Sequence, residues 1–105
     1  MNSKDLVTKI AEILDSKDAR DIETIDVSEK TIIGDYFIIA TGANVQHVRA
    51  LTDHVEEKLS EDGIEPLRKE GREDGRWCVM DYGSVIVHVF VSTTRKFFDL
   101  EKLWA

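Results

Sequence analysis

The stretch that decides the fold runs from residue 35 to residue 63 and reads DYFIIATGANVQHVRALTDHVEEKLSEDG. Its first seven residues are β-rich and almost continuously apolar, which is typical of a central strand covered on both faces of a sheet. Gly42 and Ala43 end that run, and Asn44 can cap the helix that follows. An apolar stripe at helical spacing then comprises Val45, Val48, Leu51, Val55 and Leu59. The sequence therefore predicts a strand that turns directly into an amphipathic helix, with Gly63 as its left-handed stop.

The segments on either side of this stretch predict one more helix and two more strands. Apolar residues at helical spacing indicate a helix over residues 3–17, with Ser3 as its N-terminal cap. Residues 21–27 alternate so that Ile25 and Val27 share one face, which indicates a half-buried strand. Residues 64–70 contain Pro66 and suit an edge strand, because an edge strand tolerates a missing backbone donor.

The last third of the chain predicts a hairpin followed by a helix. Two β-rich runs, 77–82 and 85–91, are joined at Gly83 and Ser84 and should form an antiparallel pair. Residues 93–104 have helical periodicity, which assigns Phe97, Leu100 and Leu103 to the core and leaves Arg95 and Lys96 off the apolar stripe. The order of elements predicts a single α/β domain over residues 1–105, of the α+β mixed-sheet kind, with about five strands and helices packed on the sheet.

Composition narrows the choice of partner. The 105 residues carry a formal net charge of −7, which argues against a broad electrostatic grip on nucleic-acid phosphate and favours a basic protein partner. The single Cys78 excludes an intramolecular disulfide and indicates a reducing compartment. The sequence shows neither a signal-peptide pattern nor an apolar run long enough to span a bilayer, so we expect a cytoplasmic protein without a membrane contact.

The residues that could carry chemistry do not form a familiar catalytic set. His47 and His54 lie two helical turns apart, about 10 Å along the axis, so they cannot easily share a metal ion. We predict no metal ion and no other cofactor. Cys78 could meet His88 across the hairpin as a thiol–imidazole pair, although a buried structural cysteine is the simpler interpretation. Trp77 and Tyr82 could stack bases, but acidic residues offset the nearby cations, which favours protein recognition.

One enzymatic alternative stays open. A degenerate nucleotidyltransferase-like enzyme of phosphate transfer could use Asp35, Asp81 and the strand-to-helix turn at Thr41 and Gly42, whose free amides could hold an anion. Two-metal nucleotidyl transfer typically needs a Gly-Ser turn followed by a pair of carboxylates that hold magnesium. The turn at Gly83 is followed by residues 85–91, which contain no acid, so this alternative requires an unusual arrangement.

Five motifs in order carry a resemblance to a known family. They are DYFIIATG at 35–42, QHVRA at 46–50, Glu70-Gly71 with Trp77, DYGSVIVHVF at 81–90 and LEKLW at 100–104. This ordered set, which spans nearly the whole chain, resembles the ribosomal silencing factor (Iojap-like) family. One departure is Ser84, which stands where that family usually has an acid.

The resemblance implies a fold related to nucleotidyltransferases but without transferase activity. It implies binding to the basic ribosomal protein L-fourteen of the large subunit, with steric obstruction of small-subunit joining and a role in large-subunit assembly. A homodimer of the free protein is implied as well. A separate alternative is a general assembly adaptor whose dimer is the active form. The predicted partner-binding residues are Trp77, Asp81, Tyr82, Glu70, His88 and Asp99.

Overall fold

The sheet is the centre of the computed structural model, which describes residues 1–104. Its five strands lie in the order β1-β2-β5-β4-β3. They are β1 (Arg20–Asp26), β2 (Tyr36–Gly42), β3 (Arg68–Glu70), β4 (Trp77–Asp81) and β5 (Val85–Val91). Strands β2 and β5 run parallel, and the other neighbouring pairs are antiparallel, so the predicted mixed sheet and the β4–β5 hairpin are confirmed.

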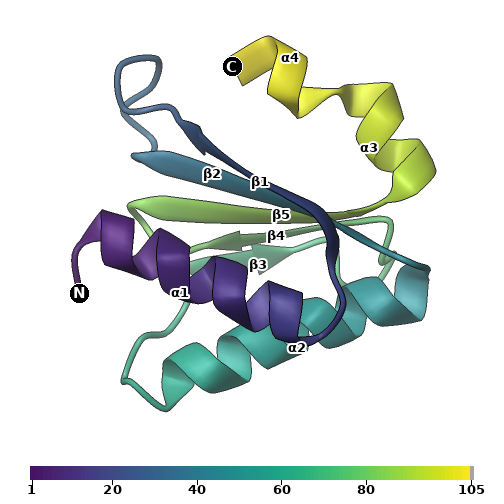
Figure 1. The fold of residues 1–105 in the computed structure, drawn as a ribbon, viewed down its shortest axis with the longest axis horizontal. Coiled ribbons are helices and arrows are strands. Elements are labelled where there is room, and N and C mark those ends of the chain that lie inside the picture. Colours follow the sequence, from purple (N-terminus) through teal and green to yellow (C-terminus); the bar gives the residue numbers. More distant parts are fainter. Residues whose placement is uncertain (105) are drawn as a thin grey trace.

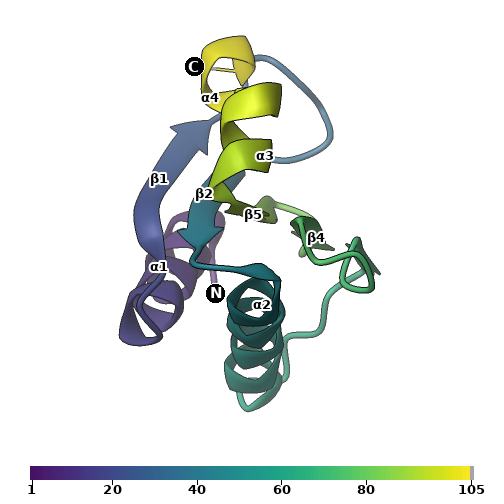
Figure 2. The same cartoon turned by 90° about the vertical axis from the view of Figure 1, so that its right-hand side faces the viewer.

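Helices cover the two faces of the sheet unequally. Helices α1 (Ser3–Ser16) and α2 (Val45–Ser60) lie side by side against one face, whereas α3 (Ser92–Phe98) and α4 (Leu100–Trp104) lie on the other (Figures 1 and 2). The two short C-terminal helices sit over β1, β2 and β5 and, apart from the Trp77 end of β4, leave β3 and β4 uncovered on that side (Figure 1). Among residues 1–104, no helix has the length and apolar character needed to cross a membrane.

The larger core fills the face under α1 and α2. It combines Ile10 and Leu14 of α1 and Leu51 and Val55 of α2 with apolar side chains of β2, β4 and β5. Two smaller clusters on the opposite face are built around Phe37 and Phe90. The predicted strand-to-helix stretch is thus confirmed: every residue of β2 after Tyr36 is buried, and the α2 stripe forms the floor of the main core.

Local details at the ends of the helices differ in part from the predictions. The side chain of Asn2, not Ser3, caps α1 by accepting the backbone N–H of Asp5 at 2.8 Å. Asn44 caps α2 as predicted. His47 is structural: its Nδ1 accepts the N–H of Ala43, and its Nε2 lies 2.8 Å from the carbonyl oxygen of Lys17 at the end of α1.

The C-terminal helix is where the sequence prediction fails most clearly. Asp99 adopts a left-handed conformation with φ 47°, and this residue splits the predicted helix into α3 and α4. The break changes the phase of the apolar stripe, so that Leu100 is buried while Phe97 and Leu103 are 80% and 71% exposed. Assigning Phe97 and Leu103 to the core was therefore wrong. Arg95, predicted off the stripe, is buried instead.

The predicted edge strand is shorter than expected. β3 contains three residues, Arg68–Glu70, and Pro66 lies before it, outside the sheet. The short strand still pairs with β4, placing Arg68 opposite Asp81 and Glu70 opposite Val79. Its three residues are exposed and charged, a composition that discourages strand addition at a sheet edge.

Candidate protein-docking face

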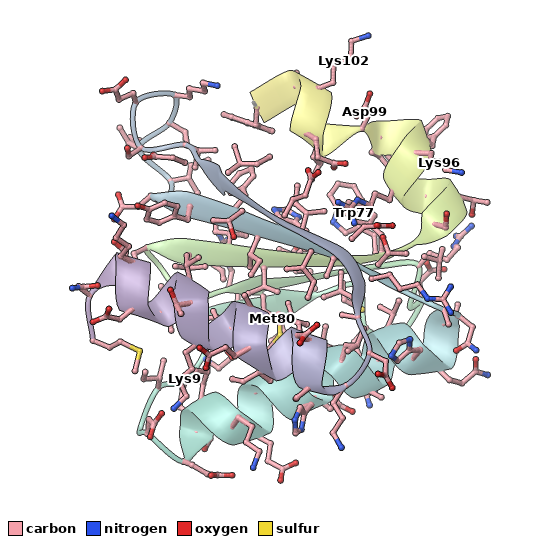
Figure 3. The ribbon with its side chains drawn as sticks, in the orientation of Figure 1. Lys9, Trp77, Met80, Lys96, Asp99 and Lys102 are labelled. Carbon is pink, nitrogen blue, oxygen red and sulfur yellow. The ribbon has the colours of Figure 1, made fainter. Side chains whose placement is uncertain are left out.

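The two faces of β4 carry different kinds of side chain. Because successive side chains of a strand point to opposite faces, Cys78 and Met80 pack into the helix-covered core, whereas Trp77, Val79 and Asp81 point to the other side. Figure 3 shows Met80 directed toward α1 and α2 and Trp77 directed toward α3. We call the region formed by Trp77, Val79 and Asp81 and their uncovered neighbours on β3 and β5 the open face.

Trp77 is held firmly at the boundary between the open face and α3. Its ring stacks on Phe90 with centroids 4.9 Å apart and contacts Phe98 at 4.7 Å. Its indole N–H donates a hydrogen bond to Nδ1 of His88 at 3.1 Å. The side chain remains partly exposed, so one edge of a rigid aromatic ring stays available to a partner.

His88 is part of the floor of the open face and carries no charge at neutral pH. It is 7% exposed, and burial lowers the pKa of its imidazole to about 4. Because Nδ1 accepts the bond from Trp77, the imidazole proton is on Nε2. That atom is buried and has no hydrogen-bond partner among residues 1–104.

A hollow of about 200 Å³ lies next to His88, which we call the β3–β4 groove. Its apolar wall is formed by Phe37, Val79 and Ile86, with the exposed side chain of Ile33 at one side. Its polar rim is formed by Arg68, Glu70 and Asp81. The groove thus combines an uncharged floor with two carboxylates and one guanidinium at its edge.

The rim charges are arranged loosely. The Arg68 guanidinium lies 3.5 Å from Oδ2 of Asp81, and the Arg68 side chain is 70% exposed. The other oxygen of Asp81 accepts the backbone N–H of Gly83 at 2.8 Å, which orients the carboxylate and stabilises the hairpin turn. Glu70 is exposed, and no ion pair to its carboxylate is found among residues 1–104.

The structure separates two predicted contact residues from the open face. Tyr82 is 9% exposed and belongs to the core under α1 and α2, on the other side of β4 from the open face, and burial raises the pKa of its phenol. Asp99 is exposed, but it lines a different hollow, shared with Arg95 and Lys96. In Figure 3 Asp99 lies on the outer side of the C-terminal helices and Trp77 beneath them. The open face thus unites Trp77, Asp81, Glu70 and His88.

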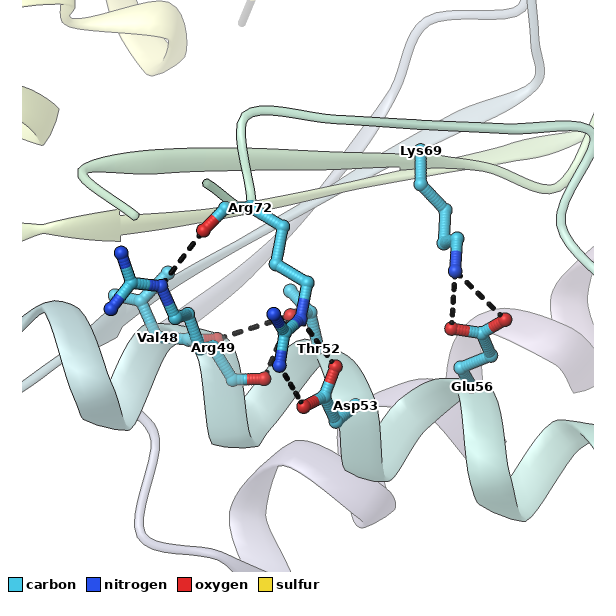
Figure 4. A network of polar contacts seen from close by, with 7 residues as sticks. All are labelled: Val48, Arg49, Thr52, Asp53, Glu56, Lys69 and Arg72. Atoms are coloured by element: carbon cyan, nitrogen blue, oxygen red, sulfur yellow. Dashed lines mark hydrogen bonds and ion pairs between the residues drawn. The ribbon is translucent and has the colours of Figure 1, made fainter. Parts of the chain in front are cut away.

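A set of ion pairs anchors β3 and the loop before β4 to α2 (Figure 4). Arg72 donates to both carboxylate oxygens of Asp53, at 2.8 and 2.6 Å, and this contact lowers the pKa of the Asp53 carboxyl. Lys69 bonds Glu56 at 2.9 Å, and the Arg49 guanidinium donates to the backbone carbonyl of Arg72 at 2.9 Å. These contacts hold the loop that leads into Trp77 and set the position of the open face.

The geometry does not bring together the residues of the enzymatic alternatives. Cys78 points into the helix-covered core while His88 lies on the open face, so the thiol–imidazole pair does not form, and burial raises the pKa of the Cys78 thiol. Asp35 precedes β2 and Thr41 lies near its far end, roughly 20 Å away at ~3.3 Å per residue. No group of three potential metal ligands occurs within residues 1–104.

Sequence reasoning missed several residues that shape this region. Val79, Ile86 and Phe37 form the wall of the β3–β4 groove, yet in the sequence they are ordinary strand residues. Phe98 was not singled out, although it contacts Trp77 and helps line a second hollow of about 540 Å³ between Trp77 and α3. The alternation of β4 was the available signal for Val79, because it places this residue between Trp77 and Asp81 on one face.

Comparisons with known proteins agree on one family. The family model described as ribosomal silencing factor during starvation matches residues 1–105. A ribosomal silencing factor of Bacillus subtilis is 36% identical over 104 residues, covering 99% of this chain and 88% of the relative. A crystal structure from Chromobacterium violaceum has a TM-score of 0.96 at 35% identity and covers 99% of this chain and 87% of that one. A mouse protein named for mitochondrial assembly of the ribosomal large subunit is 31% identical, covering 93% of this chain and 44% of that protein.

Proposed function

We propose that this chain, which belongs to the ribosomal silencing factor family, binds the large ribosomal subunit through ribosomal protein L-fourteen. The bound protein would then sterically block joining of the small subunit and so repress translation in the cytoplasm. Occupation of the same site during large-subunit assembly is part of the proposal, and the name of the mouse relative supports it.

The observation that carries this proposal is the open face with Trp77 at its edge. A Trp side chain fixed by Phe90, Phe98 and His88 loses little conformational freedom on binding, and such rings are frequent energetic centres of protein interfaces. The uncovered apolar wall around Val79 provides area that a partner can bury. The open face therefore has the properties of a binding site for another protein.

Charge supports a basic partner. The chain has a formal net charge of −7, and the rim of the open face includes Glu70 and Asp81. Opposite charges on a partner surface accelerate association, and this acceleration weakens as salt screens the charges. A basic ribosomal protein fits these conditions, whereas bare RNA would be repelled.

The proposed mechanism is steric and involves no covalent step. A domain with principal extents of 32 × 31 × 21 Å is large enough to occupy a subunit contact area once it is docked. Repression then requires that the docked position overlap the surface used by the small subunit. Binding and blocking are therefore two separate measurements.

Trp77→Ala tests the proposed contact. Truncation of an interface Trp typically costs at least about 2 kcal/mol of binding free energy, so we expect a loss of large-subunit affinity of roughly thirtyfold or more. Co-migration with purified large subunits in a density gradient measures binding, and light scattering on addition of small subunits measures joining. Leu103→Ala, which removes an exposed apolar side chain of α4, is the matched control.

Two outcomes would count against the proposal. If Trp77→Ala folds normally and binds large subunits as the unchanged protein does, Trp77 is not the anchor. If the unchanged protein binds large subunits but leaves subunit joining unaffected, the steric mechanism is wrong.

A further inference from the structure

The β3–β4 groove contains a hydrogen-bond donor that the fold itself leaves unused. His88 is 7% exposed, and its Nε2 has no partner among residues 1–104. Buried polar groups nearly always find a partner, so an unpaired one beside a hollow indicates a position for a ligand atom. The ligand atom at this position must be an acceptor, because Nδ1 already accepts the Trp77 N–H and Nε2 therefore carries the proton.

The strand register shows where this donor is directed. Trp77 stands opposite Phe90, beyond His88 toward one end of β5, whereas Asp81 stands opposite Ile86, toward the other end. The two nitrogens of an imidazole ring point in divergent directions, and Nδ1 is turned toward Trp77. His88 itself lines the groove, which lies at the Ile86 end of the strand, away from the Trp77 contact.

The rim of the groove favours a cationic group, whereas the His88 N–H favours a hydrogen-bond acceptor. Glu70 and Asp81 are diagonal neighbours on β3 and β4, with side chains on the same face and about 7–8 Å between residues. A cationic group placed between them meets two carboxylates. The wall formed by Val79 and Ile86 can pack against an aliphatic stem, which is how Lys and Arg side chains bury their carbons while the charged end stays at the rim.

We propose that the β3–β4 groove is a subsite for one Lys or Arg residue on an extended segment of the protein partner. The cationic end lies between Glu70 and Asp81, and a main-chain carbonyl of the same segment accepts the N–H of His88 Nε2. A nucleic acid cannot satisfy both requirements, because its phosphates would face the two carboxylates. The choice of a ribosomal partner rests on the function proposed above, whereas the chemistry of the subsite rests on the groove.

Arg68 has a defined part in this subsite. Its guanidinium lies 3.5 Å from Asp81 and belongs to a largely exposed side chain, so the pair is weak and easily displaced. Arg68 thus lies at the proposed cation position, beside Asp81, and competes with the cation of the partner. Its removal should strengthen binding, the opposite of the effect expected from removing Glu70.

The first experiment measures association with purified large ribosomal subunits at low and high salt. We expect Glu70→Gln to weaken binding roughly two- to fivefold at low salt and Arg68→Gln to strengthen it by a similar factor, with both effects shrinking at high salt. Glu12→Gln makes the same charge change on α1, across the sheet, and should have no effect. If Glu70→Gln and Arg68→Gln both bind like Glu12→Gln while Trp77→Ala abolishes binding, the proposed function stands and the subsite is wrong.

The second experiment tests the groove without the ribosome. The 15N signal of His88 Nε2 is followed during titration with acetyl-Gly-Arg-Gly-amide and with the same peptide carrying uncharged citrulline in place of arginine. We expect a saturable shift with the arginine peptide, and several-fold weaker binding both for the citrulline peptide and in the Glu70→Gln variant. Equal shifts for both peptides, or none at millimolar concentration, would overturn the subsite. A saturable arginine-specific shift in a protein that fails to bind large subunits would instead refute the proposed function.

Discussion

Replacing Arg95 with methionine should destabilise the protein by about 3 kcal/mol. The Arg95 guanidinium donates to the backbone carbonyl of Asp21 at 2.6 Å, to Oγ1 of Thr41 at 2.8 Å and to Glu101 at 3.2 Å. These bonds join α3 to β1, β2 and α4. Methionine keeps a similar apolar stem, so the substitution removes the bonds with little loss of packing volume.

The magnitude follows from the burial of the group. Hydrogen bonds to charged groups contribute about 1.5–3 kcal/mol each, so the three bonds of Arg95 sum to about 4.5–9 kcal/mol. Taking a guanidinium out of water costs several kcal/mol and offsets much of that sum, since the side chain is 9% exposed. A net loss of about 3 kcal/mol in the free energy of unfolding corresponds to a fall in Tm of roughly 10–25 °C.

Urea denaturation followed by circular dichroism measures this effect, and Lys96→Met is the matched control. Lys96 is the next residue of α3, has the same charge and is exposed, with its side chain directed outward in Figure 3. Its substitution should change the free energy of unfolding by less than about 0.5 kcal/mol. If Arg95→Met and Lys96→Met unfold at the same urea concentration, the buried contacts of Arg95 do not stabilise the C-terminal helices.

Three further predictions concern stability. Burial lowers the pKa of His88 to about 4, so the stability that neutral His88 contributes is complete above about pH 6.5 and is lost as pH falls toward 4. Over this window the free energy of unfolding should fall about 2–3 kcal/mol more in the unchanged protein than in His88→Asn. Parallel pH curves for the two proteins would refute this prediction. Leu100→Ala should cost about 2–4 kcal/mol and Leu103→Ala less than about 0.5 kcal/mol by thermal unfolding, and equal costs would contradict the break at residue 99. In urea unfolding, Gly75→Ala should lower the free energy of unfolding by at least about 1 kcal/mol more than Gly63→Ala. Both glycines have positive φ, but only at Gly75 would the added carbon collide with a valine of α2. Similar values for the two variants would show that the loop moves to make room for the added carbon.

The elements that sequence analysis predicted well have a local signal. The stripe of α2, the cap at Asn44 and the apolar run of β2 specify their structures through periodicity and side-chain type alone, and each was confirmed. The C-terminal helix had the same kind of signal and was misread. Helical spacing presumes an unbroken helix, and nothing in the side chain of Asp99 announced its left-handed backbone.

The candidate site on the open face also has some features that the local sequence predicts and others that it does not. Alternation along β4 already placed Trp77 and Asp81 on one face and Tyr82 on the other with Cys78 and Met80, but it could not say that α1 and α2 cover the Tyr82 side. It also could not place Glu70 beside Val79, since that neighbour depends on the register of β3.

The sequence by itself therefore determined most of the elements, the family resemblance and the acidic character, because each depends on residue type and near neighbours along the chain. Tertiary structure alone decided the burial of Arg95, the Trp77–His88 bond and the groove between β3 and β4. These features depend on distances between residues far apart in the sequence, such as Asp21 and Arg95, and no local pattern contains such distances. Only the packed sheet brings the groove's apolar wall and its charged rim together.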